Sequence, residues 1–192
     1  MVTGFPADAG ASAAADESLD TSEGLGADGQ DAAYAAAAGT PDPELPMLTI
    51  ADLGILRSVD VGAEGVVVTI TPTYSGCPAM REIGADVRRR LVAAGFDRIT
   101  VKTQLAPPWS TDWITDGGRR KLAEAGIAPP SPAPRRSGPV PVKLSTVPAD
   151  SPRCPRCGSA STRETARFSA TACKSLHRCE ACGEPFEAVK AL

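Results

Sequence analysis

The apolar residues in the middle of the chain first follow the pattern of a β-hairpin. Residues 55–61 and 66–71 are short runs rich in β-branched side chains, which pack well on a pleated sheet. The four residues between them begin and end with glycine, as a tight turn requires. The pattern therefore predicts two antiparallel strands. Just before them, a short helical turn is expected to begin at Thr49 and end at Gly54.

A helical period replaces the strand pattern at Pro78. The next apolar residues are spaced three or four apart, on one face of an α-helix: Met80, Ile83, Val87, Leu91 and Ala94. Gly95 ends this helix, a third strand is expected at 99–105, and a second helix at 115–125. The order strand, strand, helix, strand, helix predicts a small two-layer α/β domain over residues 41–128.

Composition divides the rest of the chain into three parts. Residues 1–40 are mainly Ala, Gly, Asp, Glu and Ser, with too few large apolar side chains to offset the entropy of ordering, so they are expected to be disordered. Residues 129–152 contain eight prolines and are expected to form an extended linker. The remaining residues, 153–192, form a separate module.

Charge and hydropathy exclude several classes of protein. Ten of the 23 acidic residues precede Arg57, whereas all 20 basic residues lie from Arg57 onward. The basic residues are scattered without interleaved aromatic ones, so a solvated helix face is expected at residues 88–90 rather than a nucleic-acid surface. No apolar stretch approaches the ~20 residues of a membrane span, and the acidic N-terminus is not expected to be a secretory signal. A cytoplasmic location with reduced thiols is therefore expected.

Four cysteines in the last module form two pairs, Cys154 with Cys157 and Cys179 with Cys182. Two residues separate the members of each pair and 21 residues separate the pairs, the spacing of a tetrahedral metal site on a β-hairpin. One structural Zn²⁺ is expected, and it would supply most of the folding free energy of so small a module. Four thiolates also suit iron or a labile cluster, which the spacing leaves open.

Two more potential ligands lie between these pairs. Cys173 is interpreted as an extra thiol that does not bind the metal. The alternative is that Cys173 takes the place of one of the four paired cysteines as a ligand. The only histidine, His177, is expected at the surface or behind the ligands rather than on the metal.

Cys77 is the candidate functional residue of the α/β domain. It immediately precedes Pro78, so it is expected at the start of the helix, where free amides and the helix dipole favour a thiolate. Such a thiolate can be a nucleophile, a redox centre or a metal ligand, and a small core residue is the plain alternative. Asp52 is the carboxylate expected to face Cys77, and an isolated surface aspartate is the alternative. A nucleophile would need a base, and His177 lies in the other module, so no enzymatic activity is expected.

Several motifs resemble the FSCA family of iron–sulfur assembly factors. They are DPELP at 42–46, DLG at 52–54 and TPTYSGCP at 71–78. The arrangement over residues 41–192 more closely resembles the PaaD (PaaJ) family, the accessory subunits of phenylacetyl-CoA epoxidase. The further matches are LAPPWSTDWI at 105–114, KL at 121–122, GIAPP at 126–130, CPRCGS at 154–159, SATACK at 169–174 and EPF at 184–186.

The resemblance implies an FSCA-type domain, a C-terminal zinc ribbon and a non-catalytic role in aerobic phenylacetate degradation. It implies maturation of an iron–sulfur cluster, with the flavin- and iron–sulfur-containing reductase component as client. Cys77 would hold a transient cluster or iron, alone or across a homodimer. The matching pattern also includes Cys173. A purely structural subunit that docks epoxidase components is the alternative function.

Overall fold

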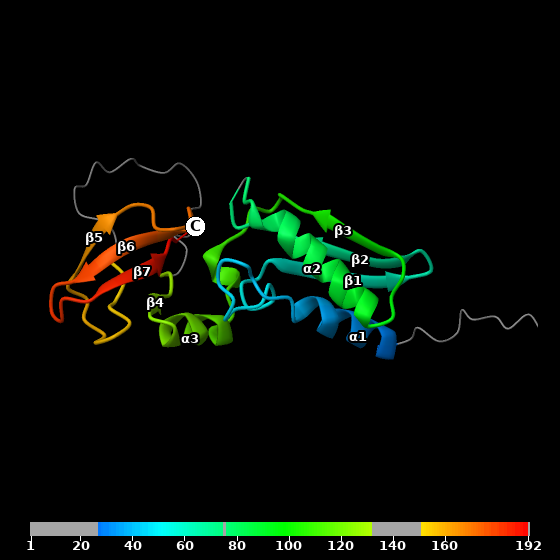
Figure 1. The fold of residues 1–192 in the computed structure, drawn as a ribbon, viewed down its shortest axis with the longest axis horizontal. Helices are drawn as coiled ribbons and strands as arrows, with labels where there is room; N and C mark the ends of the chain where they lie inside the picture. The colour runs from blue at the N-terminus through cyan, green and yellow to red at the C-terminus, as the bar shows by residue number, and fades with distance from the viewer. Residues whose placement is uncertain (1–26, 75, 132–150, 192) are drawn as a thin grey trace, which may run out of the picture.

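The computed structural model describes residues 27–74, 76–131 and 151–191. Two β-sheets lie one after the other along the long axis of the molecule (Figure 1). One sheet has three strands in the order β1-β2-β3, and the other has four in the order β4-β7-β6-β5. Within the described ranges, no helix is long and apolar enough to cross a membrane.

The first sheet is built on the predicted hairpin. Strand β1 (Leu56–Gly62) pairs antiparallel with β2 (Gly65–Ile70), and β2 pairs in parallel with β3 (Ile99–Thr103). Alternate residues of β2 are buried: Val66, Val68 and Ile70. The alternation shows that one face of this sheet contacts the core.

Helix α2 (Ala79–Ala93) connects the parallel strands β2 and β3 and covers the buried face of the sheet (Figure 1). Parallel strands need such a crossover, because a tight turn cannot join them. Ile83, Val87 and Leu91 are each at most 1% exposed, so the predicted helical face is the one that packs. Helix α3 (Asp116–Glu124) also forms, with the Thr115 hydroxyl accepting a hydrogen bond from an amide of its first turn. The predicted two-layer α/β arrangement is confirmed.

Helix α1 (Ala27–Ala38) corrects the prediction for the N-terminal part. Ala33 and Ala37 are fully buried, and α1 lies beside β1 and α2. The Gln30 side chain donates to the carbonyl of Val59 and accepts from the amide of Val61. The expectation of disorder up to residue 40 is therefore wrong for this helix, because small alanine side chains can pack closely. The remainder of that prediction, residues 1–26, lies outside the described residues.

The second sheet extends the expected hairpin to four strands. Strands β5 (Thr162–Ala166), β6 (Lys174–Cys179) and β7 (Pro185–Val189) form an antiparallel ribbon. Strand β4 (Ile127–Ala128), which follows α3, pairs in parallel with β7.

The pairing of β4 changes where the two modules meet. The predicted boundary at residue 128 assigned this strand to the α/β domain, but its hydrogen bonds place it in the ribbon sheet. The modules are thus joined through a sheet as well as along the chain. Most of the predicted linker, residues 132–150, lies outside the described residues.

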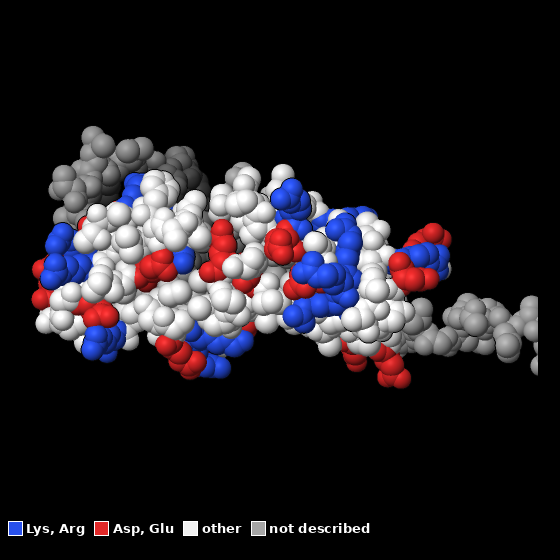
Figure 2. Space-filling view, in the orientation of Figure 1, with Lys and Arg blue, Asp and Glu red and all other residues white. Residues whose placement is uncertain are grey.

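Basic side chains gather over α2 (Figure 2). Arg88 and Arg89 are exposed, and Asp86 pairs with Arg89 at 3.0 Å and with Arg90 at 3.3 Å. Exposed pairs of this kind contribute about 0–1 kcal/mol each. The surface therefore fits the predicted solvated helix face.

Candidate functional site

The sulfur atoms of the four paired cysteines lie together at one end of the ribbon. All four are within 4.8 Å of one another. The Sγ of Cys154 is 3.8 Å from that of Cys182, and the Sγ of Cys157 is 3.6 Å from that of Cys179. The two turns are alike, because the amide four residues after the first cysteine of each pair donates to that cysteine's carbonyl, at 2.8 and 2.9 Å.

The electrostatics of this group fit a metal ion. A hydrogen bond from the Cys182 amide favours the thiolate of Cys179 and helps to lower its pKa to about 7. The amide of Ser159 acts similarly on Cys157, but the neighbouring sulfurs prevail and raise the pKa of Cys157 to about 12. Four crowded thiols cannot all ionise unless a cation offsets their charge. Zn²⁺ coordinated by all four would do so.

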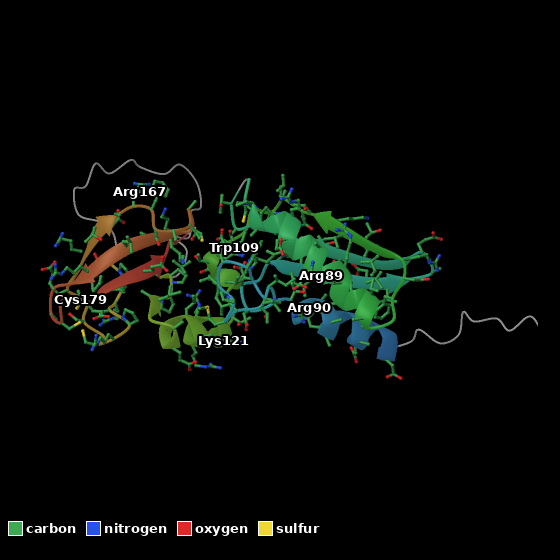
Figure 3. All side chains as sticks on the ribbon, viewed as in Figure 1. Arg89, Arg90, Trp109, Lys121, Arg167 and Cys179 are labelled. Atoms are coloured by element: carbon green, nitrogen blue, oxygen red, sulfur yellow. The ribbon has the colours of Figure 1, made fainter. Side chains whose placement is uncertain are left out.

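This metal group lies away from the α/β domain. Figure 3 shows Cys179 at the outer end of the ribbon, whereas Trp109 lies near the junction of the two modules. Cys173 and His177 are not among the four clustered residues.

His177 is buried within the ribbon, not at the surface. It is 6% exposed, stacks on Phe186 with ring centroids 5.6 Å apart, and lies 2.9 Å from the hydroxyl of Ser175. Burial lowers the pKa of His177, so it acts as a neutral core residue.

Cys77 lies in the loop between β2 and α2 and is half-buried. Its sulfur accepts a hydrogen bond from the amide of Ala79, the first residue of α2, and the side chain of Tyr74 also hydrogen-bonds to it. Pro78 occupies the N-cap position. The predicted placement of Cys77 at the start of this helix therefore agrees with the structure.

Cys77 lines a pocket at the junction of the two modules, with a cavity volume of about 30 Å³. The pocket has apolar walls, with two carboxylates, two thiols and one amine among its lining side chains. The polar and charged members are Asp42, Glu44, Thr73, Cys77, Cys173 and Lys190. The last two come from the ribbon, so both modules form this pocket.

Cys173 reaches the pocket from the loop between β5 and β6. Its sulfur is 3.1 Å from the hydroxyl of Thr171 and 3.8 Å from Oε2 of Glu44, a residue of the other module. The sixth thiol is thus placed beside the α/β domain rather than beside the zinc ligands.

The pocket raises the pKa of both thiols. For Cys77 the main cause is burial, which outweighs the amide of Ala79, and the carboxylates of Glu44 and Asp42 add to the increase. For Cys173 burial is again the main cause of the raised pKa. The expectation that the helix start would make the thiolate of Cys77 easy to form is therefore wrong, because desolvation is the larger effect.

The structure does not place Asp52 in this pocket. Its carboxylate accepts from the ammonium of Lys121 at 2.6 Å and from the amide and hydroxyl of Thr49 at 2.9 and 3.1 Å. Asp52 therefore stabilises the turn before β1 and ties it to α3.

Asp42 and Glu44 are the carboxylates that share the pocket with Cys77. Asp42 is 7% exposed and accepts from the amides of Glu44 and Leu45 at 2.9 and 2.8 Å. This short turn directs residue 44 toward the ribbon. Residue types alone do not reveal this proximity, although both carboxylates belong to the motif at 42–46.

Two family models match the chain. Residues 30–102 match the model of an iron–sulfur cluster assembly protein, and residues 139–190 match the PaaD zinc beta ribbon domain. The first match begins within α1, in agreement with the packing of that helix on the domain. The ribbon match and the four clustered sulfurs together identify a structural zinc site.

Two curated proteins are similar in sequence. A protein of Escherichia coli (strain K12), provisionally named as a subunit of 1,2-phenylacetyl-CoA epoxidase, is 43% identical over 152 residues, which are 79% of this chain and 87% of that protein. An Fe–S protein maturation auxiliary factor of Porphyromonas gingivalis (strain ATCC BAA-308 / W83) is 38% identical over 83 residues, 42% of this chain and 78% of that protein.

Solved structures also resemble the chain. The DUF59 domain of unknown function from Bacillus anthracis is 29% identical with a TM-score of 0.45, over 48% of this chain and 90% of that one. Rv1466 from Mycobacterium tuberculosis, a protein associated with Fe–S complex assembly and repair, is 35% identical with a TM-score of 0.28, over 58% and 93%.

Proposed function

The chain belongs to the PaaD family of phenylacetyl-CoA epoxidase subunits, and from this premise we propose that it assembles or transfers iron–sulfur clusters for the epoxidase system. The proposal makes it an accessory, non-catalytic subunit. The observation that carries it is the position of Cys77. This thiol lies in a pocket of the segment that matches an iron–sulfur cluster assembly protein.

The chemistry of the pocket favours a cargo site over a nucleophile. Among the described residues, no histidine lines the pocket, and burial raises the pKa of Cys77, so nothing there prepares its thiolate for attack on a carbon centre. A metal ion can displace the thiol proton, because a sulfur–metal bond stabilises the thiolate directly. Cys77 would therefore hold iron, or an iron–sulfur cluster, as cargo.

Weak attachment suits a transfer protein. A stable cluster is held by four cysteine thiolates, and the described lining of the pocket offers fewer. The complete set of four thiolates lies instead in the zinc ribbon, at the other end of that module. The two metal sites would thus have separate roles: zinc holds the ribbon together, and the pocket carries the cargo.

The client that we propose is the reductase component of the epoxidase, which contains flavin and an iron–sulfur cluster. A relative of this chain bears the name of an epoxidase subunit, and another bears the name of an Fe–S protein maturation factor. The reductase satisfies both names, because it belongs to the epoxidase system and contains an iron–sulfur cluster that must be assembled.

The test is to produce the reductase in cells that also make this chain, either unchanged or as Cys77→Ser. We expect Cys77→Ser to lower the iron and acid-labile sulfide bound per reductase, while the variant itself retains its zinc. Met80→Leu is the matched control, because Met80 lines the same pocket without offering a thiolate. Full cluster content with Cys77→Ser would contradict the proposal.

A further inference from the structure

The ribbon supplies a second thiol to the pocket of Cys77. Cys173 lines that pocket although it is separate in space from the zinc ligands. Glu44, a carboxylate of the other module, lies 3.8 Å from the sulfur of Cys173. Two thiols and a carboxylate therefore border one cavity, and they come from three separate segments of the chain.

Tyr74 shows how close these three groups are. Its side chain hydrogen-bonds to Cys77, and burial together with the neighbouring charges of Cys77, Glu44 and Cys173 raises the pKa of Tyr74. One hydroxyl thus contacts Cys77 and lies within electrostatic range of Glu44 and Cys173. Glu44, Cys77 and Cys173 are far apart along the chain, so the fold brings them together.

The cavity suits a single ion. Its volume of about 30 Å³ exceeds the ~10–15 Å³ needed to hold one water molecule, so an ion fits with room for a bound water. Thiolate and carboxylate donors together select transition-metal ions such as Fe²⁺ and Zn²⁺ over Ca²⁺ or Mg²⁺.

We propose that Cys77, Cys173 and Glu44 bind one divalent transition-metal ion, with Fe²⁺ as the physiological occupant. This inference rests on the proposed function and specifies its cargo as a single iron ion. Two S–H bonds are replaced by two sulfur–metal bonds, and both protons pass to solvent. The two thiolates then offset the charge of the ion, and the carboxylate leaves the site with one net negative charge.

The ribbon completes this site. Within the described residues only the zinc ligands form a group of three or more with donor atoms inside 4.8 Å, so the pocket must close around its ion. Cys173 is already 3.8 Å from Glu44, so the movement required is an approach between Cys77 and the other two ligands, and Cys173 lies on a loop that can supply it. Withdrawal of the loop would remove one thiolate and loosen the ion for transfer.

The test is an oxygen-free titration of the full, zinc-loaded chain with Co²⁺, a coloured stand-in for Fe²⁺, followed by competition with Fe²⁺. We expect one Co²⁺ per chain beyond the zinc, with sulfur-to-cobalt charge-transfer absorption. Cys77→Ser and Cys173→Ser should each weaken binding by about 10- to 100-fold or more, since loss of outer-shell partners alone has that effect. Both variants should lose absorption, because one thiolate remains instead of two.

Two further variants complete the experiment. Glu44→Gln should weaken binding while keeping the two-thiolate absorption. Ala172→Ser, which is exposed and next to Cys173, should bind as the unchanged chain does. A zinc content of one per chain in every variant shows that the ribbon remains folded.

The remaining outcomes distinguish failure of the two-thiol metal site from failure of the proposed function in iron–sulfur transfer. Loss of binding in Cys77→Ser with unchanged binding in Cys173→Ser overturns the two-thiol site and leaves the proposed function standing. Unchanged binding in both variants places the metal elsewhere and overturns the two-thiol site. The cluster content of the reductase then decides separately whether the proposed function also fails.

Discussion

At the scale of single residues, Cys77 shows how burial can reverse the effect of a helix start. The amide of Ala79 favours the thiolate, as expected for a residue that precedes a helix. The surrounding pocket, with Glu44 and Asp42 among its walls, disfavours it more strongly. A thiol that stays protonated in the free protein is protected from oxidation until a metal replaces its proton.

This balance predicts slow alkylation of Cys77 at neutral pH. In the zinc-loaded, iron-free chain, iodoacetamide should modify Cys77 more slowly at pH 7 than it modifies a free cysteine. The rate should rise through a midpoint above the usual cysteine pKa of about 8.5. Peptide mass spectrometry over a series of pH values measures this rate, and the urea-unfolded chain is the reference. A midpoint below that of the unfolded chain would contradict the assignment.

The same shift has a consequence for stability. A raised pKa means that the folded chain holds the proton of Cys77 more tightly than the unfolded chain does. The protonated thiol of Cys77 therefore contributes fully to the stability of the fold below the pKa that Cys77 has in the unfolded chain. This contribution is lost as the pH rises through the pKa of Cys77 in the folded chain.

At the scale of elements, the long periodic segments could be predicted from sequence, and the short or alanine-rich ones could not. Helix α2 is recognisable because its apolar residues recur with a helical period. Helix α1 buries only alanines, and its contacts with β1 supply what its composition lacks. Strand β4 has only two residues, and its pairing with β7 is what makes it a strand. Tertiary contacts that decide such elements leave no local pattern.

The candidate site divides in the same way. The zinc ligands could be predicted because fixed spacing brings each pair together. The neighbours of Cys77 could not, because the turn at Asp42 and the docking of the ribbon bring Glu44 and Cys173 to it. Nearness in the expected fold favours Asp52, but Lys121 holds that carboxylate elsewhere.

The contact between α3 and the turn before β1 can be tested with two neighbouring glycines. A Cβ on Gly118 would lie 2.8 Å from the backbone oxygen of Asp52, which has no room to move. Gly118→Ala should therefore lower the free energy of unfolding by about 1–3 kcal/mol, despite the better helix propensity of alanine. Gly117→Ala is the control, since its nearest contact would be 3.6 Å, and it should gain up to about 1 kcal/mol. Urea unfolding of both variants measures the difference. Equal stabilisation by both would contradict this packing.

At the scale of the whole molecule, the ribbon and the α/β domain are connected by more than the chain. Strand β4 joins them through hydrogen bonds to β7, and the pocket takes lining residues from both modules. The zinc at the outer end of the ribbon would thus maintain a wall of the pocket at the other end. Loss of zinc should therefore be felt at Cys77, although Cys77 is not a zinc ligand.

This coupling predicts that zinc removal exposes Cys77. Treatment with a strong chelator should unfold the ribbon, because its four thiolates lose the ion that holds them together. Alkylation of Cys77 at pH 7 should then approach the rate in the urea-unfolded chain. Restoring Zn²⁺ should reverse the change. An alkylation rate that is indifferent to zinc would show that the ribbon does not cover the pocket.

The cluster content of the epoxidase reductase is the most direct measure of the central claim. Iron and acid-labile sulfide per reductase should be high with the unchanged chain and with Met80→Leu, and low with Cys77→Ser, although all three chains carry one zinc. The opposite result is a reductase with equal cluster content in all three cases. If the Cys77→Ser chain also co-purified in full proportion with the epoxidase, that result would replace cargo transfer with a purely structural role.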